Sequence, residues 1–394
     1  MRRAPLLAAA VTLAIGLACS ERIPGPDASA PDLAKGGGGS GKVNSVSVAP
    51  ASAAVPVGGT VQLTATASPP KGASTFAWTT SNASVATVSA TGLVTGVAAG
   101  MATIGASAGG KTGSATVTVA AEPPTGDHPV LVGAGDIAVC TSSADEATAA
   151  LLDAIPGTVF TLGDNAYDNG TAAEFRDCYG PSWGRHRART RPSAGNHEYH
   201  TQLASGYFGY FGAAAGDPEK GYYSYDLGDW HVVVLNSNSN CTTIGCGPDS
   251  PQIAWLRADL AANPRLCTVA YWHHPRFNSG QSHGSNTAMG TIWSVLAEFH
   301  VDVVLNGHEH IYERFAPQTP AAVADPAHGI RQFTVGTGGR SFYSIGTIKA
   351  NSEVRQNHTN GVLKLTLRPG AYDWQFVPVA GKTFTDTGTG SCHN

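Results

Sequence analysis

Several short apolar runs in the second half of the chain end in clusters of polar residues of the kinds that bind metal ions. Residues 130–132, 159–162, 267–272 and 301–305 are such runs, and each is predicted to be a buried strand. In open α/β sheets ligands bind beyond the carboxyl ends of the strands, because the loops converge there. This repeated arrangement therefore constrains the chain to gather its polar clusters along a sheet edge.

The clusters carry aspartate, asparagine, tyrosine and histidine. They are Gly135-Asp136, Gly163-Asp164-Asn165-Ala166-Tyr167, Gly195-Asn196-His197-Glu198, His273-His274-Pro275 and Asn306-Gly307-His308-Glu309-His310. The third cluster follows a weaker strand. In four of the five a glycine directly precedes a metal-type ligand, which permits a sharp turn and a close approach of the backbone. Each cluster alone is typical of a turn or loop, but their combination predicts a metal site.

The histidines divide the chain in two. All 14 lie beyond the linker predicted at residues 122–127, so chemistry that needs imidazole belongs to residues 128–394. In that region helices alternate with strands early, and strands cluster late. The predicted helices and late strands are 252–260, 289–300, 331–335, 362–367 and 372–377. This order predicts an α/β (α+β) domain in which two mixed sheets pack together between helices.

Residues 43–121 have a different pattern of short strands. Val61, Leu63 and Ala65 alternate with polar residues, which is the period of a half-buried strand. Regular Gly- and Ser-rich turns predict an all-β sandwich. Segments 46–48, 57–61 and 90–96 resemble the bacterial immunoglobulin-like group 2 family. The resemblance implies a spacer or adhesion module that contacts cell-surface or extracellular material, and the absence of histidine argues against catalysis there.

Residues 1–19 have the pattern of an export signal. Two arginines precede an apolar stretch, residues 6–15, that is too short to span a bilayer. The following segment, residues 16–19, is similar to a bacterial lipoprotein processing site and implies lipidation of Cys19, with ordinary cleavage and secretion as the alternative. Residues 20–42 are Gly- and Ser-rich towards their end and predict a flexible tether. We therefore expect an extracytoplasmic protein, either a cell-envelope lipoprotein or a secreted one.

Six cysteines remain if Cys19 is the anchor, an even number that suits disulfides in an oxidising compartment. Six cysteines allow about 15 pairings. The pairing we expect is Cys140–Cys178, Cys241–Cys246 and Cys267–Cys392. The alternative for Cys267 is a buried thiol in an apolar strand.

The overall charge gives no indication of a polyanionic partner. The formal net charge is −4, and only 13% of the residues are charged. We therefore expect no nucleic acid and no membrane contact other than through a lipid anchor. An anionic substrate would have to be attracted by local charge, which bound metal ions would supply.

Taken in order, the five clusters resemble the signature blocks of calcineurin-like metallophosphoesterases, over about residues 128–380. Tyr167, three residues after Asp164, and the run 273–279 are similar to the purple acid phosphatase branch of that family. The resemblance implies a four-layer metallophosphoesterase sandwich. It also implies a hydrolase that acts on phosphoric ester bonds.

The resemblance further implies the ligands of two metal ions. Those of the first are Asp136, Asp164, Tyr167 and His310, and those of the second are Asp164, Asn196, His273 and His308. Asp164 would bridge the ions, about 3.5–4 Å apart. Tyr167 would bind as phenolate although free tyrosine has a pKa of about 10, which argues for Fe(III), with a divalent zinc, iron or manganese as the second ion.

The implied mechanism is attack of a metal-bound hydroxide on phosphorus, in line with the leaving group. Asn196, His197 and His283 are expected to bind the substrate, and His283 to protonate the leaving oxygen. The alternative for His283 is an exposed loop histidine. We expect Glu198 to orient a histidine, and His274 to be a neighbour of the site rather than a ligand.

Hydrolysis of small phosphate monoesters is the leading functional hypothesis. Phosphodiesterase or nucleotidase activity on the same metal core is the second. The third is a non-enzymatic surface adhesion protein that carries a degenerate phosphoesterase scaffold. Its weakness is that every expected ligand position is filled, which a scaffold does not need.

Overall fold

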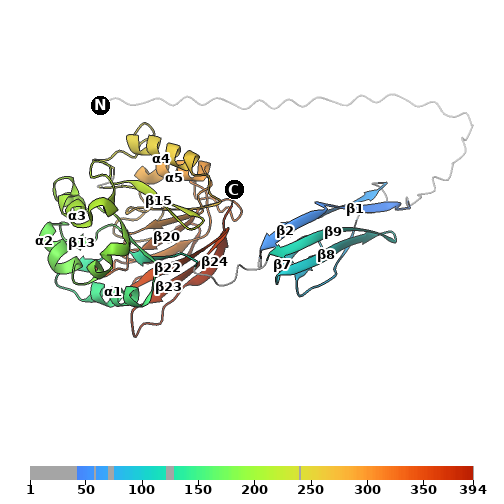
Figure 1. Ribbon diagram of the computed structural model, residues 1–394, viewed down its shortest axis with the longest axis horizontal. Coiled ribbons are helices and arrows are strands. Elements are labelled where there is room, and N and C mark those ends of the chain that lie inside the picture. Colours follow the sequence, from blue (N-terminus) through green and yellow to red (C-terminus); the bar gives the residue numbers. More distant parts are fainter. Residues whose placement is uncertain (1–41, 57–58, 70–74, 121–127, 239–240, 394) are drawn as a thin grey trace, which may run out of the picture. The chain divides into compact units, whose positions relative to one another are not determined.

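The computed structural model describes residues 42–56, 59–69, 75–120, 128–238 and 241–393 (Figure 1). The chain divides into two compact units, the first ending at Ala120 and the second beginning at Ala121. The predicted export signal, Cys19, almost all of the predicted tether and the predicted linker lie outside the described residues. In the described ranges no helix combines the length and the apolar character needed to cross a membrane.

The first unit consists of strands packed around an apolar core. Its strands are β1 (Ser45–Ala49), β2 (Ser52–Pro56), β3 (Thr60–Gln62), β4 (Thr64–Ser68), β5 (Ala77–Thr80), β6 (Ala86–Val88), β7 (Leu93–Gly96), β8 (Gly100–Ala108) and β9 (Lys111–Ala120). They pair in the orders β1-β4, β2-β9-β8-β5 and β3-β7-β6. Alternate residues such as Ala102, Ile104 and Ala106 of β8 are buried, as the period-two pattern requires.

The second unit contains a six-stranded sheet in the order β14-β12-β10-β22-β23-β24. Its strands are β10 (Val130–Ala134), β12 (Thr158–Leu162), β14 (Thr190–Ser193), β22 (Gly361–Arg368), β23 (Ala371–Pro378) and β24 (Thr387–Ser391). The strands β10, β12 and β14 are parallel, whereas β22 to β24 are antiparallel. The sheet is therefore mixed, as predicted.

A second sheet has seven strands in the order β15-β16-β17-β18-β20-β19-β21. They are β15 (Tyr223–Leu227), β16 (Trp230–Val234), β17 (Cys267–Tyr271), β18 (Val303–Asn306), β19 (Tyr312–Phe315), β20 (Arg331–Val335) and β21 (Ser352–Gln356). The strands β16, β17, β18 and β20 run parallel, whereas β15 and β19 run antiparallel to their neighbours. A small parallel pair joins β11 (Ala138–Val139) to β13 (Ala166–Tyr167).

Helices cover this second unit on both sides (Figure 1). The α-helices are α1 (Ala144–Ala154), α2 (Ala172–Glu174), α3 (Ser205–Phe211), α4 (Pro251–Ala262) and α5 (Gly290–Glu298). One π-helical turn and five 3-10 segments occupy Phe175–Tyr179, Trp183–Arg189, Glu198–His200, Gln202–Ala204, Gly212–Ala215 and Thr287–Met289. The helices predicted at 252–260 and 289–300 are α4 and α5, whereas α1 was not predicted.

The apolar strands of the second sheet are buried on both faces. Val232 and Val234 of β16 pack in a core shared with the six-stranded sheet, and Val233 packs in the core beneath α4 and α5. Strands buried on both faces have continuous apolar runs instead of alternation. This explains why the runs in the sequence are apolar throughout and why their polar residues stand only at the ends.

The six cysteines of the second unit form three disulfides. They are Cys140–Cys178, Cys241–Cys246 and Cys267–Cys392, the pairing expected from the sequence. The alternative of a free buried thiol at Cys267 is wrong. The Cys267–Cys392 disulfide joins β17 to the segment near the end of the described chain. Its two cysteines are 125 positions apart in the sequence.

His231 on β16 is buried between two carboxylates. Its Nδ1 lies 2.9 Å from Asp226 Oδ1 on β15, and its Nε2 lies 2.8 Å from Asp259 Oδ2 on α4. Burial lowers the pKa of His231, but the hydrogen bonds with Asp259 and Asp226 outweigh burial, and the pKa is raised. A charged imidazolium that donates from both nitrogens therefore ties helix α4 to the edge of the sheet.

A group with a higher pKa in the folded state stabilises the fold below its unfolded pKa, and this contribution is lost as the pH rises through the folded pKa. The change His231→Gln should therefore lower the free energy of unfolding by about 1–3 kcal/mol near pH 6, and by clearly less near pH 9. Urea unfolding at the two pH values measures the difference. The matched change His328→Gln, at an exposed histidine, should leave the free energy of unfolding unchanged at both pH values. An equal loss from His231→Gln at both pH values would contradict this account.

Candidate metal centre

The predicted ligands follow the carboxyl ends of parallel strands in both sheets. Asp136 follows β10, Asp164 follows β12 and Asn196 comes shortly after β14 in the six-stranded sheet. His273 comes two residues after β17, and His308 follows β18, in the seven-stranded sheet. The two sets of strand ends adjoin, because the backbone N–H of His308 donates to Asp136 Oδ2 over 2.9 Å. Side chains far apart in sequence therefore meet at one place.

Three of these ligands have a left-handed backbone conformation. The φ angle is 59° at Asp136, 49° at Asp164 and 70° at His308. Such conformations cost about 1–3 kcal/mol for residues other than glycine and concentrate at functional sites. The glycines in the same turns are required by space. A Cβ at Gly195 would collide with the Asp164 carboxylate, and one at Gly307 would lie 2.8 Å from Asp136 Oδ2.

We call Asp136, Asp164, Tyr167 and His310 the Tyr167 cluster. Tyr167 Oη lies 2.9 Å from Asp136 Oδ1 and 3.1 Å from Asp164 Oδ2. The same oxygen lies 3.2 Å from His310 Nε2. His310 Nδ1 lies 2.7 Å from the carbonyl oxygen of Ser341, which assigns the proton of a neutral ring to Nδ1. The lone pair on Nε2 therefore points into the cluster.

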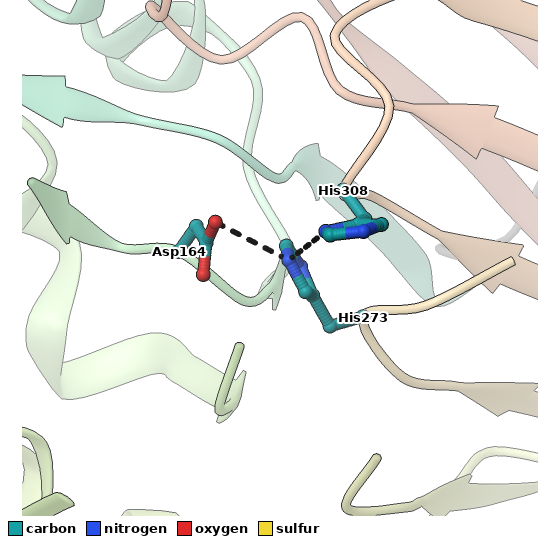
Figure 2. Close-up of side chains that lie close together, drawn as sticks. All are labelled: Asp164, His273 and His308. Atoms are coloured by element: carbon teal, nitrogen blue, oxygen red, sulfur yellow. Dashed lines mark hydrogen bonds and ion pairs between the residues drawn. The ribbon is translucent and has the colours of Figure 1, made fainter. Parts of the chain in front are cut away.

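We call Asp164, Asn196, His273 and His308 the His273 cluster. His273 Nε2 lies 3.0 Å from Asn196 Oδ1, 3.1 Å from His308 Nδ1 and 3.3 Å from Asp164 Oδ2. Figure 2 shows the Asp164 carboxylate and the His308 imidazole both directed at the ring of His273. His273 Nδ1 lies 2.6 Å from the carbonyl oxygen of Leu162, so a neutral His273 turns its Nε2 lone pair to the cluster.

Both clusters gather more acceptor atoms than the available protons can satisfy. One phenolic proton faces two carboxylates and an imidazole nitrogen in the Tyr167 cluster. In the His273 cluster one proton on His273 Nε2 faces the Asn196 and Asp164 oxygens and the Nδ1 nitrogen of His308. Converging oxygen and nitrogen lone pairs are the donor set that zinc and iron prefer.

The ligand atoms of Asp164, His273 and His308 all lie within 4.8 Å of one another and form a group that could hold a metal ion. Asp164 Oδ2 contacts both Tyr167 Oη and His273 Nε2, so it lies between the two clusters. The residues therefore fit a pair of cations with one shared carboxylate.

Asp164 and His273 shift each other's pKa. Burial raises the pKa of Asp164, but the neighbouring imidazole of His273, through its charge and its hydrogen bond, holds that pKa well below its usual range. Burial lowers the pKa of His273, yet Asp164 raises it to about 9. Burial and the neighbouring histidines keep the pKa of His308 well below its usual range, so this ring is neutral, as metal ligation requires.

Tyr167 is in an environment that opposes the phenolate. Burial, and then the carboxylates of Asp136 and Asp164, raise the pKa of Tyr167 well above its usual value. A phenolate ligand at this position would therefore require a strongly charged cation in contact with its oxygen.

Glu198 binds backbone and not a histidine side chain. Its buried carboxylate accepts hydrogen bonds from the backbone N–H groups of Asp164, Asn165 and Gly195 over 2.9, 2.7 and 2.7 Å. The expectation that Glu198 orients a histidine is wrong in this respect. Burial, and then Asp164, raise the pKa of Glu198 to about 7, against the effect of these hydrogen bonds. Glu198 therefore fixes the turns that carry two of the ligands.

The two histidines predicted to bind substrate flank the clusters. The ring of His197 lies 4.5 Å from the Tyr167 ring, and its Nδ1 lies 2.6 Å from the carbonyl oxygen of Asp168. The ring of His283 lies 4.1 Å from the His308 ring and is 42% exposed. His283 is therefore an exposed loop histidine that also lies at the site.

His274 lies next to the His273 cluster and points to a different partner. Its Nδ1 lies 2.8 Å from Ser237 Oγ, and its ring lies 4.2 Å from the His308 ring. This agrees with the expectation that His274 is a neighbour.

Arg340, Tyr343 and Glu309 also contact the site and were missed. The Arg340 guanidinium lies over the Tyr167 ring, 4.7 Å from its centroid, and the Tyr343 ring stacks on His310 at 3.9 Å. The signal for Arg340 was present, because strand β20 is followed by Gly336-Thr337-Gly338-Gly339-Arg340, which repeats the strand–glycine–polar pattern. No such pattern in the sequence predicts the side-chain contacts of Glu309.

Two protein families match this chain. The bacterial Ig-like domain (group 2) family matches residues 42–119, and the calcineurin-like phosphoesterase family matches residues 130–312. The chain therefore carries a bacterial Ig-like domain followed by a calcineurin-like phosphoesterase domain, which confirms both predicted resemblances.

The second domain is similar to plant purple acid phosphatases. Purple acid phosphatase 22 of Arabidopsis thaliana is 39% identical over 123 residues, which cover 30% of this chain and 27% of that protein. Purple acid phosphatase 23 of the same plant is 31% identical over 163 residues, which cover 36% of this chain and 34% of that protein. The chain thus spans about a quarter to a third of the length of these curated relatives.

Solved structures share the fold. Purple acid phosphatase PPD1 from yellow lupin (Lupinus luteus) seeds matches with a TM-score of 0.53 and 17% identity over 84% of this chain and 68% of that chain. GAP50, the anchor in the inner membrane complex of Plasmodium, matches with a TM-score of 0.51 and 12% identity over 68% and 90% of the two chains. Together with the two mixed sheets, these matches confirm the predicted fold class.

Removal of one ligand from the His273 cluster should reduce metal binding without unfolding the domain. The change His308→Ala deletes a nitrogen that faces the cluster, so we expect the purified protein to lose about one equivalent of bound metal relative to wild type. Elemental analysis after dialysis measures the content, and circular dichroism checks the fold. The matched change His328→Ala, at an exposed histidine, should keep the full content. A His308→Ala protein with unchanged metal content would show that the site lies elsewhere.

Proposed function

We propose that this chain is an exported phosphoesterase that hydrolyses small phosphate monoesters at a centre of two metal ions. The convergence of acceptor atoms from seven side chains on two adjoining clusters supports this most strongly. The similarity of the second domain to purple acid phosphatases supports the substrate class.

The Tyr167 cluster would hold Fe(III), and the His273 cluster would hold a divalent zinc, iron or manganese ion. The oxygen-rich donor set of the Tyr167 cluster supports the trivalent ion, because the Tyr167 oxygen lies beside the carboxylates of Asp136 and Asp164. The amide oxygen of Asn196 and the imidazoles of His273 and His308 suit a divalent ion. When bound, the pair of ions would supply a nucleophile at neutral pH and neutralise charge on the phosphoryl oxygens.

The surrounding histidines would bind the ester and move the proton. His197 donates from Nδ1 to the carbonyl of Asp168, which fixes its ring and leaves Nε2 for the phosphate or the leaving oxygen. His283 places Nδ1 3.2 Å from Glu309 Oε2, so its Nε2 is the atom that can carry a proton to the leaving oxygen. Asn196 would contribute to substrate binding beside its metal.

We further propose that the protein works outside the cytoplasm. Three disulfides suit an oxidising compartment, and the Ig-like domain suits contact with cell-surface or extracellular material. Lipidation of Cys19 would anchor the protein to the cell envelope, and cleavage of the export signal without lipidation would secrete it.

Two other functions follow from the same fold. Phosphodiesterase or nucleotidase activity would use the same two clusters on a substrate with a different leaving group. A non-enzymatic adhesion protein would have no need for seven ligand positions that are all filled and directed inward, so we rank it last.

The monoester proposal predicts a preference between two chromogenic substrates. We expect kcat/KM for p-nitrophenyl phosphate to exceed that for bis(p-nitrophenyl) phosphate by about tenfold or more, because two cations best neutralise the more highly charged monoester. Initial rates on the purified, metal-loaded protein measure both values. A higher value for the diester would favour the phosphodiesterase alternative.

The phenolate proposal predicts colour. A tyrosinate bound to Fe(III) absorbs visible light, so the metal-loaded wild-type protein should be coloured and the Tyr167→Phe protein should be colourless. Absorption spectra together with the iron content measure this. The change Tyr343→Phe is the control, because Tyr343 stacks on His310 and contributes no ligand. A colourless, active zinc protein would reject the iron assignment and keep the phosphoesterase one.

A further inference from the structure

The loop that carries His283, residues 279–284, is bound by the buried carboxylate of Glu309. Glu309 Oε1 accepts a hydrogen bond from the backbone N–H of Ser282 over 2.9 Å. Its Oε2 accepts from the backbone N–H groups of His283 and Gly284, over 2.9 and 3.3 Å, and faces His283 Nδ1 at 3.2 Å. Glu309 itself is completely buried. Three consecutive backbone donors and one imidazole therefore converge on a single side chain.

A second buried carboxylate holds the beginning of the same loop. Glu313 on β19 accepts from the backbone N–H of Ser279 over 2.8 Å and from Ser352 Oγ over 2.5 Å. The loop also pairs with a neighbouring loop, since the N–H of Gln281 donates to the carbonyl oxygen of Ser344 over 2.9 Å. The segment 279–284 is thus fixed along its length although His283 is 42% exposed.

The hydrogen bonds of Glu309 indicate a role different from that of His308 and His310, its neighbours in the sequence. Glu309 stands between His308 and His310 in sequence, yet the side-chain hydrogen bonds that it makes within the described residues all go to residues 282–284. The fit is tight, because a Cβ at Gly280 would collide with the Glu309 carboxylate. In the turn between β18 and β19, His308 and His310 therefore face the two clusters, and Glu309 between them faces the loop.

We propose that Glu309 is a positioning residue that holds His283 over the His273 cluster so that it can protonate the leaving oxygen. The inference rests on the proposed function and deepens it. Glu309 accepts at both oxygens and keeps the proton of His283 on Nδ1, which leaves Nε2 towards the substrate side. A proton donor misplaced by about 1 Å loses much of its effect. A loop with glycine at positions 280 and 284 needs such an anchor, because glycine costs the most backbone entropy to fix.

The test uses two monoesters that differ in their need for a proton. p-Nitrophenolate leaves without protonation, whereas an alkoxide does not. In the full-length, metal-loaded protein, Glu309→Gln should lower kcat for an alkyl phosphate by about tenfold to a hundredfold and kcat for p-nitrophenyl phosphate by much less. The change His283→Ala should give the same selective loss. The double variant should be no slower than His283→Ala alone, because both changes remove one function.

Metal content and a matched control complete the experiment. Glu309→Gln should retain the wild-type metal content and KM, and Glu298→Gln, an exposed glutamate on α5, should leave both rates unchanged. If Glu309→Gln does not fold, Gly280→Ala displaces the same carboxylate and should give the same selective loss. Equal losses on both esters, loss of metal, additive losses in the double variant or unchanged rates would each overturn the proposal. If the wild-type protein hydrolyses neither ester, the proposed function fails instead.

Discussion

The carboxylate of Asp164 is enclosed by the two sheets and is only 2% exposed. One of its oxygens accepts from the backbone N–H of His197, and the other faces both Tyr167 Oη and His273 Nε2. A buried carboxylate without a partner costs several kcal/mol, so positive charge has to be placed against it. His273 Nε2 lies 3.3 Å from this carboxylate, and two cations would supply the charge. The rest of the centre is arranged around this requirement.

The requirement explains the local backbone. Three ligands adopt left-handed conformations, and glycines stand where a neighbouring ligand would meet a Cβ. Glu198 compensates for the strain by binding three backbone N–H groups of these turns. The sheets contribute rigidity, because strands buried on both faces cannot move without opening the core. The loops that carry the ligands are therefore fixed by the rigid strands before them and by the hydrogen bonds to Glu198.

Much of this could be predicted from the sequence, and the rest could not for identifiable reasons. Apolar runs that end in polar clusters are local patterns, so the fold class and the gathering of these clusters at one sheet edge could be predicted from them. The assignment of the individual metal ligands, and the roles expected of His197 and His283, came from the family resemblance. Helix α1 was missed although its buried residues have helical spacing, because Leu152 is the one large apolar side chain among Asp145, Thr148, Ala149 and Leu152. Contacts between distant polar residues leave no pattern. The sequence could not show that Glu309 binds the His283 loop, that Glu198 binds backbone or that His231 joins two aspartates.

The central claim is that two cations occupy the adjoining clusters and share Asp164. Crystals of the metal-loaded protein, measured with anomalous scattering at the iron and zinc edges, test it most directly. The account predicts two anomalous peaks about 3.5–4 Å apart, with iron beside Tyr167 and the second metal beside His273. A single peak, or peaks away from Asp164, would contradict it.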